Sequence, residues 1–365
     1  MVAGWNDDTG RGWSPYGLAA RIGAAEARAQ AELDAAIADL AIADGLRLDD
    51  RTRLDIDTML GTLVTTLGST LRRHACRLLA DRDIDGVAAL RPVADLMPAL
   101  LATGLLQDRA LVAALVGRAR HDRIAAALPL AVAEGDAPSL LIRLAGAADG
   151  DVADAALVML GLDGRRREGW ERGEPGPADL PVPLHADLAW RIAAALRATD
   201  ATAAVARATD RALATATVRL LAGYGEAERA DGVALALAMA ITPRQDDMAA
   251  LLVAAIDDRR LDLFTALIAY RLDIAMPDMR AIVVDPVGDR LWLALRALSL
   301  ERTPLARIAL ALADADPRRD IDAFAIQLDA IAAIPPQEAA AALAPLALPA
   351  AFHVAIRAMG QRSRW

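Results

Sequence analysis

The chain has 365 residues, of which 40 are basic and 49 are acidic, and its net charge of -9 disfavours a general nucleic-acid-binding protein. Apolar residues make up 55% of the chain but aromatic residues only 3%, so the apolar share consists mainly of Ala and Leu. Both are strong helix formers, and apolar residues rarely alternate with polar ones, so the composition predicts an all-α protein.

The cysteine and the apolar runs indicate where such a protein functions. Cys76 is the single cysteine, which excludes an intrachain disulfide and is typical of a reducing compartment. The longest apolar runs, 124–133 and 233–241, are about half of the ~20 residues that a membrane span needs. The N-terminus lacks the basic start and apolar run of a signal peptide. We therefore expect a cytoplasmic protein that does not enter the membrane.

The first 44 residues predict a flexible tail followed by a long helix. Residues 1–15 hold Trp5 and Trp13 among Gly, Asp and Asn, and read as a loose tail. Residues 16–44 read as one Ala-rich helix with a narrow apolar stripe formed by Leu18, Ile22, Ala25, Ala29, Leu33, Ile37 and Leu40. Such a stripe can pack against a partner or a second copy of the chain, so homo-oligomerisation through this helix is one possibility.

Residues 49–163 predict an N-terminal helical array. Its first helix has the clearest period, with Ile56, Met59, Leu60, Leu63 and Leu67 on one face. Gly68-Ser69 is expected to end this helix and to start the next one. Shorter helices are expected near 92–102, 108–118, 121–133, 138–148 and 151–162.

Residues 164–184 contain four prolines and no apolar period, so they predict a loop and the best candidate for a domain boundary. A C-terminal helical-repeat array is expected over 185–359, with helices near 185–196, 201–222, 226–240, 244–257 and 259–272. The segment 242–245 predicts a capping box, in which Thr242 caps, Pro243 opens the helix and Gln245 reaches back. Helix-pair starts near 244, 277, 303 and 335 are spaced close to the periods of helical repeats.

The fold prediction is therefore all-α, as an irregular HEAT-like array of short antiparallel helices, either an α-solenoid or a compact helical array. Within it, "VVDPVGDRLWLALRAL" (283–298) predicts a corner between two helices. Gly288 allows a tight bend, Asp289 caps the next helix, and Leu291, Leu295 and Leu298 form the inner stripe of that helix beside Trp292. The pairs of aspartates elsewhere are interpreted as helix caps and solvated groups.

Several segments resemble one bacterial family. They are "RLDIDTMLGTLVTTLGSTLRRHACRLLADR" (53–82), residues 100–129, "LPVPLHADLAWRIAAALR" (180–197) and residues 289–333. These segments are similar in sequence to the family called domain of unknown function 2336, and the similarity runs from about residue 50 to the end. The resemblance implies an α-helical, HEAT-like, soluble protein, and it implies no catalytic residue.

No motif predicts a catalytic, cofactor or metal site. The four histidines are scattered and lack metal-ligand spacing, so each is expected on the surface or in packing, and Cys76 is expected to be a buried structural thiol. No GxSxG or P-loop occurs, and all basic residues are arginine. The candidate partner-binding residues are Trp5 and Trp13 in the tail, which either dock a partner or fold back, and Arg165, Arg166, Arg167, Trp170 and Arg172 in the expected loop. A solvated linker is the alternative for the loop.

These observations favour a non-enzymatic helical-repeat protein that binds a protein partner as an adaptor or scaffold, without a cofactor or a membrane. The alternative is a nucleic-acid-acting protein similar in fold to the HEAT-like DNA glycosylases, which the acidic charge disfavours.

Overall fold

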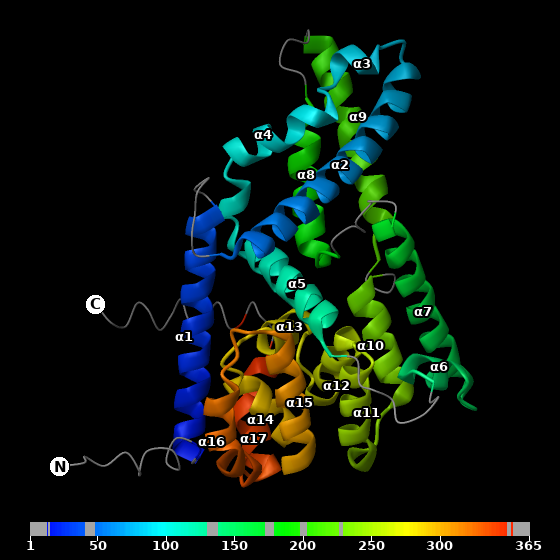
Figure 1. The fold of residues 1–365 in the computed structure, drawn as a ribbon. Helices are drawn as coiled ribbons and strands as arrows, with labels where there is room; N and C mark the ends of the chain where they lie inside the picture. Colours follow the sequence, from blue (N-terminus) through cyan, green and yellow to red (C-terminus); the bar gives the residue numbers. More distant parts are fainter. Residues whose placement is uncertain are drawn as a thin grey trace, which may run out of the picture. The chain divides into compact units, whose positions relative to one another are not determined.

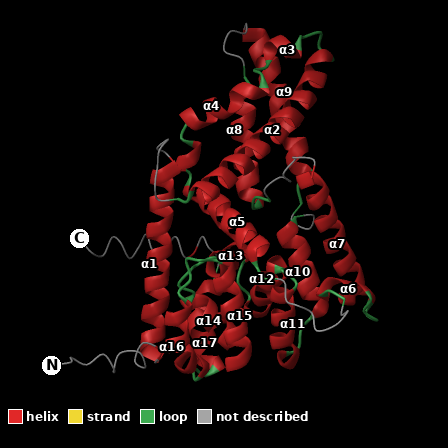
Figure 2. Ribbon diagram, in the orientation of Figure 1, coloured by secondary structure: helices red, strands yellow, loops and turns green. Residues whose placement is uncertain are grey.

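The computed structural model describes residues 13, 15–40, 48–129, 138–171, 179–197, 203–225, 229–348 and 352. These residues form α-helices, short 3-10 helices and connecting turns, without a strand (Figure 1; Figure 2). A single isolated bridge joins Leu90 and Arg197, where the Arg91 N–H donates to the Leu196 carbonyl at 2.8 Å. The all-α prediction is confirmed.

The chain forms two compact units, and each is discontinuous in sequence. Unit 1 comprises residues 1–31, 120–160 and 233–365, and unit 2 comprises residues 32–119 and 161–232. This division differs from the predicted boundary at 164–184. The changes of unit fall inside helices α1 (Pro15–Leu40), α5 (Arg109–Ala127), α7 (Gly150–Glu171) and α10 (Ala230–Ile241). Gly161 and Gly232 stand at two of these changes, but neither interrupts its helix, so the sequence does not mark the boundaries there.

Unit 2 is built around a long helix, α2 (Asp50–Ala80). It packs against α3 (Gly86–Ala89), α4 (Leu96–Ala102), α8 (Val182–Ala195) and α9 (Ala203–Ala222). The predicted apolar face of α2 is largely confirmed, because Ile56, Leu60, Leu63 and Leu67 are buried in one core. Asp49 caps this helix as expected, and its carboxylate accepts from the Thr52 N–H at 2.9 Å.

The expected break at Gly68-Ser69 is wrong, because α2 continues through both residues. Gly68 instead allows a close approach of α4, since a Cβ at this position would lie 2.6 Å from the Leu96 Cδ1 atom. Gly68 thus reports close packing rather than a helix end.

Unit 1 contains α6 (Leu140–Ala145), α11 (Gln245–Asp257), α12 (Leu261–Leu272), α13 (Met276–Val283), α14 (Asp289–Ala297), α15 (Arg302–Ala315), α16 (Ile321–Ala332) and α17 (Pro336–Leu343). The most deeply buried of these are α12 and α14. Helix α14 packs against α12, α13, α16 and α17 (Figure 1). Its predicted inner stripe is confirmed, because Leu291, Leu295 and Leu298 are buried.

The apolar stripe of α1 is covered within the chain. In unit 1, Leu18, Ile22 and Ala25 are buried. In unit 2, Leu33, Ile37 and Leu40 pack against the hydrophobic core. The stripe that made self-association through this helix a possibility therefore already has partners inside the molecule.

Three further helix predictions need correction. The segments expected at 108–118 and 121–133 form one helix, α5. Thr242 does not cap α11, because it ends α10 with a φ of 41° and its hydroxyl donates to the Met239 carbonyl. Gln245 does not reach back either, since its amide donates to the Ser299 hydroxyl at 2.8 Å. A local turn bond of Thr242 and a tertiary partner of Gln245 thus replace the capping box.

Candidate functional sites

Trp13 lies in packing rather than on the surface. Its side chain is 5% exposed, and the Arg21 guanidinium lies 4.2 Å from the centre of a Trp13 ring. The Trp13 Nε1–H donates to Gln327 Oε1 at 3.2 Å. Of the two alternatives for this residue, folding back is therefore the one observed. Trp5 lies outside the described residues.

The expected loop at 164–184 begins as a helix. Helix α7 extends to Glu171, so Arg165, Arg166, Arg167 and Trp170 have helical backbone. Arg and Glu are good helix formers, and the first proline of this segment comes only at 175, so the local sequence permits the extension. Arg172 lies outside the described residues. Whether these residues bind a partner stays a prediction.

One group of side chains in unit 1 resembles a nucleophile, base and acid. The His121 Nε2 atom lies 3.2 Å from the Thr265 hydroxyl, and its Nδ1 atom lies 3.5 Å from Asp262 Oδ1. However, the Thr265 hydroxyl donates its proton to the Leu261 carbonyl at 2.7 Å, and Thr265 is fully buried. The hydroxyl therefore accepts from His121 and does not face a substrate. Of the two roles expected for the histidines, surface or packing, His121 has the packing one.

A second buried histidine lies in unit 2. The His185 ring stacks on Tyr224 with their centres 3.5 Å apart, and the Tyr224 hydroxyl donates to the Leu180 carbonyl at 2.7 Å. Burial, and then the charge of Arg229, lower the pKa of His185 to about 4. Burial raises the pKa of Tyr224 to about 12. Both rings are therefore neutral near pH 7, and this pair serves packing.

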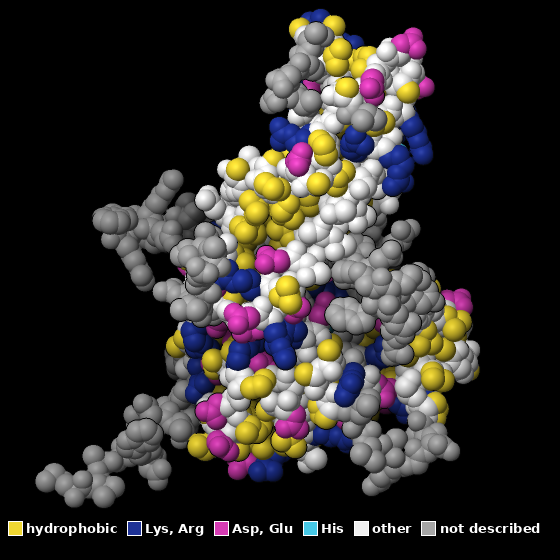
Figure 3. Space-filling model, turned by 45° about the horizontal axis from the view of Figure 1, so that its top comes forward, with side chains coloured by type: hydrophobic (Ala, Val, Ile, Leu, Met, Phe, Trp, Pro, Cys, Tyr) yellow, Lys and Arg dark blue, Asp and Glu magenta, His cyan; other side chains and the backbone are white. Residues whose placement is uncertain are grey.

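The surface of unit 2 carries a groove between α4 and α8 with a volume of about 570 Å³. It is lined by Arg91, Ala99, Leu100, Thr103, Arg191, Ala194 and Ala195. Two large apolar side chains on the same helices, Leu101 and Trp190, are 42% and 43% exposed. Figure 3 shows hydrophobic side chains gathered on the surface near α2 and α4. We call the space lined by Arg91, Ala99, Leu100, Thr103, Arg191, Ala194 and Ala195 the α4–α8 groove.

The charge of the α4–α8 groove is partly neutralised. The Arg191 Nη2 atom donates to Asp108 at 3.0 Å, and its Nε atom lies 2.6 Å from Asp187. These bonds orient Arg191 on its helix and reduce its attraction for a highly charged ligand.

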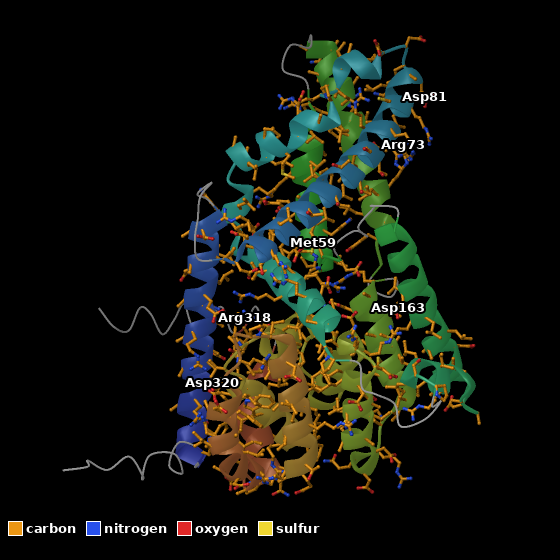
Figure 4. All side chains as sticks on the ribbon, in the orientation of Figure 1. Met59, Arg73, Asp81, Asp163, Arg318 and Asp320 are labelled. Carbon is orange, nitrogen blue, oxygen red and sulfur yellow. The ribbon has the colours of Figure 1, made fainter. Side chains whose placement is uncertain are left out.

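Unit 1 contains a cavity of about 270 Å³ between α14, α15, α16 and the turn that joins α15 to α16. Its apolar walls include Trp292 and Phe324, whose ring centres are 4.5 Å apart. Its polar lining residues are Asp289, Arg318, Arg319, Asp320 and Gln327. Figure 4 shows Arg318 and Asp320 on that turn. We call this space the α14–α16 cavity.

Asp289 has a different role from the expected one. Gly288, with a φ of 74°, stands at the N-cap of α14, and no side-chain cap bond forms there. Asp289 is buried and accepts hydrogen bonds from Arg21 and Arg28 of α1, each at 3.1 Å. The expected capping role is therefore wrong, because two arginines distant in sequence take the carboxylate.

Asp316 and two neighbouring arginines form the polar edge of the α14–α16 cavity. Arg318 donates from Nε and Nη2 to the two oxygens of Asp316, both at 2.8 Å. These bonds hold the pKa of Asp316 below its usual value, although burial alone would raise it. Arg319 lies only within 3.8 Å of the same carboxylate and is 9% exposed. The interpretation of the paired aspartates as caps and solvated groups is wrong for Asp316, whose carboxylate is buried and paired with Arg318.

The Arg319 side chain has a single described hydrogen bond, from Nη2 to the Val283 carbonyl. Its Nε and Nη1 atoms are buried without a hydrogen-bond partner. Burial lowers the pKa of Arg319 to about 10, so the guanidinium still carries its charge near neutral pH. The cavity thus has a buried cation with unused donors at its edge.

Sequence reasoning did not find these sites. Arg318 and Arg319 stand in "DADPRRDID", which reads as an ordinary solvated turn. Proline next to paired charges was the one available signal, and it is equally typical of a helix start. Only the tertiary structure shows that the turn lines a cavity.

Among the residues that the structure describes, no group of three or more His, Cys, Asp or Glu is arranged to hold a metal ion. Over the same part of the chain, every helix is too short or too polar to cross a bilayer. No protein-family model, curated protein or solved structure matches this chain.

Proposed function

We propose that this protein is a non-enzymatic adaptor or scaffold that binds a protein partner through the α4–α8 groove. The observation that carries the proposal is a groove with small side chains between α4 and α8, two helices that also carry the exposed Leu101 and Trp190. Tryptophan is enriched among the residues that contribute most to protein interfaces. An exposed apolar patch next to a groove is a feature of interaction surfaces.

The groove suits an amphipathic helix with acidic residues. Ala99, Ala194 and Ala195 leave room for the apolar side chains of such a helix between α4 and α8. Arg91 lines the same groove and favours a carboxylate over a basic residue on the partner. The expected partner is therefore an amphipathic, acidic helix.

A nucleic acid is a weaker candidate for this groove. Arg191 is already held by Asp108 and Asp187, so little positive charge remains for phosphates. The net charge of -9 acts against phosphate binding at longer range.

Three finer expectations belong to this proposal. The arrangement is HEAT-like, the protein acts in the cytoplasm, and the chain is related to the family called domain of unknown function 2336. The single cysteine supports the cytoplasmic location. The sequence similarity of residues 53–82 and 289–333 supports the relationship to the family.

The test is a comparison of groove variants in affinity purification from native lysate, with mass spectrometry of the retained proteins. Ala194 is exposed, so Ala194→Glu places a charge in the groove without disturbing a core. Trp190→Ala removes the exposed ring. Both variants are expected to lose at least about 90% of a partner that the wild type retains, since a central aromatic residue commonly contributes ~2 kcal/mol or more.

The matched control is Leu310→Ala, because Leu310 is 55% exposed and lies on α15 of unit 1. This variant is expected to retain the partner. Equal retention by the two groove variants and the wild type would contradict the proposal. Loss of nucleic acid rather than protein in the groove variants would favour the alternative function.

A further inference from the structure

We propose that the α14–α16 cavity of unit 1 binds a small monocarboxylate with an aromatic or aliphatic body, its carboxylate next to Arg319. The proposal is independent of the α4–α8 groove, which belongs to unit 2. It rests on the unused donors of a buried arginine, on the pairing of the nearby charges, and on the size and lining of the cavity.

Arg319 supplies the donors. Its Nε and Nη1 atoms are buried without a hydrogen-bond partner, while Nη2 is held by the Val283 carbonyl. A buried charged group without partners is costly, and such groups are usually paired. The Asp316 carboxylate, which lies 3.8 Å from Arg319 Nε, has both oxygens engaged by Arg318 at 2.8 Å. A ligand carboxylate in the cavity would give Arg319 a hydrogen-bonded partner, because the Asp316 carboxylate is already bound by Arg318.

The charged side chains that line the cavity are of both signs, Arg318 and Arg319 with Asp289 and Asp320. Asp289 is paired with Arg21 and Arg28, and Asp316 is paired with Arg318. Among the described residues, no carboxylate is hydrogen-bonded to the Arg319 guanidinium, so a bound monoanion would give this charge a partner.

The remaining acidic lining groups are already engaged. Asp289 accepts from two arginines, and Asp320 accepts from the Ala323 N–H at 2.9 Å as the cap of α16. Their charges still oppose a dianion such as phosphate, which makes a monocarboxylate the better fit. Gln327 adds a neutral polar side chain to the lining, and its oxygen accepts from the Trp13 Nε1–H.

The size of the cavity limits the ligand. Its volume of about 270 Å³ is roughly nine times the ~30 Å³ that one water occupies in the liquid. Trp292, Phe324, Ile321 and Ile331 offer apolar contact to a ring or a short chain. Benzoate and hexanoate have the required size, charge and apolar body.

The first experiment measures binding of benzoate and hexanoate to the purified full chain by saturation-transfer NMR and calorimetry at pH 7. We expect a Kd of about 0.1–1 mM for ligands this small. Benzyl alcohol, which has a similar body without the charge, is expected to bind at least about tenfold more weakly. Equal binding of benzoate and benzyl alcohol, or no binding of either acid, would overturn the proposal.

The second experiment places the ligand in the cavity with a matched pair of substitutions on α16. Ala323 lines the cavity, whereas Ala325 is exposed on the same helix and does not line it. Ala323→Leu is expected to abolish benzoate binding by filling the space, and Ala325→Leu to leave the Kd within about twofold. Benzoate binding that survives Ala323→Leu unchanged would place the ligand elsewhere and overturn the assignment.

Arg319→Gln tests the proposed carboxylate contact and keeps a polar side chain. It is expected to weaken benzoate by at least about tenfold and to leave benzyl alcohol unchanged. An equal loss for both ligands would show that Arg319 only supports the wall, which contradicts the contact. Should Arg319→Gln fail to fold, the Ala323 and Ala325 pair and the comparison of benzoate with benzyl alcohol still decide the proposal.

Discussion

Asp289 accepts a hydrogen bond from Arg21 at 3.1 Å, although 268 positions separate the two residues in sequence. Both belong to unit 1, so this ion pair fastens the first helix to the start of α14. Arg28 binds the second carboxylate oxygen from about two helical turns further along α1. The corner of the chain at residue 289 is therefore held by tertiary ion pairs and not by a local cap.

Asp289→Ala is expected to destabilise the protein by about 2 kcal/mol. Removal of the carboxylate takes away the acidic group that both arginines bind, and breaking a buried pair costs ~3–5 kcal/mol. The arginine side chains are 25% and 38% exposed, so water compensates part of the loss. The free energy of unfolding, measured in urea, tests this value.

Asp314→Ala is the matched control, because Asp314 is an exposed residue of α15 in the same unit. Its expected effect is within about 0.5 kcal/mol of zero. Equal losses in the free energy of unfolding for the two substitutions would show that Asp289 contributes no more than a surface charge does.

The fold class could be predicted because the signals for a helix are local in sequence. The period of Ile56, Leu60, Leu63 and Leu67 follows from one turn of helix, and the same residues form the buried face of α2. Glycine misled the prediction at position 68, where it marks close packing with Leu96. The predicted capping box at 242–245 is also wrong, because the Gln245 side chain donates to the Ser299 hydroxyl and not to its own cap residue.

The candidate sites could not be predicted, because each depends on contacts between distant segments. Arg319 lies beside its neighbour Arg318 in sequence, yet only one of them is bonded to Asp316 at 2.8 Å. That difference depends on the turn between α15 and α16 and on the Val283 carbonyl. The pattern of residues specifies two arginines, and the tertiary structure distinguishes them.

Gly288→Ala is expected to destabilise unit 1 by about 2 kcal/mol or more. Its φ of 74° lies in the left-handed region, which costs other residues ~1 kcal/mol. A Cβ at this position would also lie 2.7 Å from Trp292 Nε1, so the indole has to move. Urea unfolding followed by tryptophan fluorescence measures the loss.

Gly23→Ala provides the comparison for Gly288→Ala. Gly23 lies in α1, where a Cβ on this residue would have nothing within 4 Å, and alanine there is expected to stabilise the helix by up to ~1 kcal/mol. The interpretation of Gly288 is wrong if both substitutions stabilise the protein.

Gly86→Ala is expected to loosen the contact between α2 and α3 in unit 2. The added Cβ would lie 2.8 Å from Cys76 Sγ and 2.9 Å from its Cα, and the backbone atom cannot rotate away. Overpacking of this kind typically costs ~1–3 kcal/mol. Cys76 is half-buried and free, so its reaction with a thiol reagent should also become faster.

The control for Gly86 is Gly61→Ala in α2, where no atom lies within 4 Å of the new Cβ. It is expected to increase stability slightly and to leave the thiol reaction rate of Cys76 unchanged. Unaltered Cys76 reactivity in Gly86→Ala would show that the two helices do not meet as closely as the structure has them.

His185 is expected to make stability depend on pH. Its pKa is about 4 in the folded protein, below the ordinary value of 6.5 that applies to the unfolded chain. The unfolded chain therefore binds more protons between these two values. Stability from this residue is complete above pH 6.5 and is lost as the pH falls towards 4, by about 2 kcal/mol at pH 5.

His185→Phe separates this effect from the titration of carboxylates, which also weakens proteins in acid. Phenylalanine keeps a ring to stack on Tyr224 but has no proton to gain. The free energy of unfolding of the wild type, measured in urea at pH 7 and at pH 5, should fall by about 2 kcal/mol more than that of the variant. Parallel pH profiles for the two proteins would mean that His185 is solvated enough to titrate normally, which would contradict its burial against Tyr224.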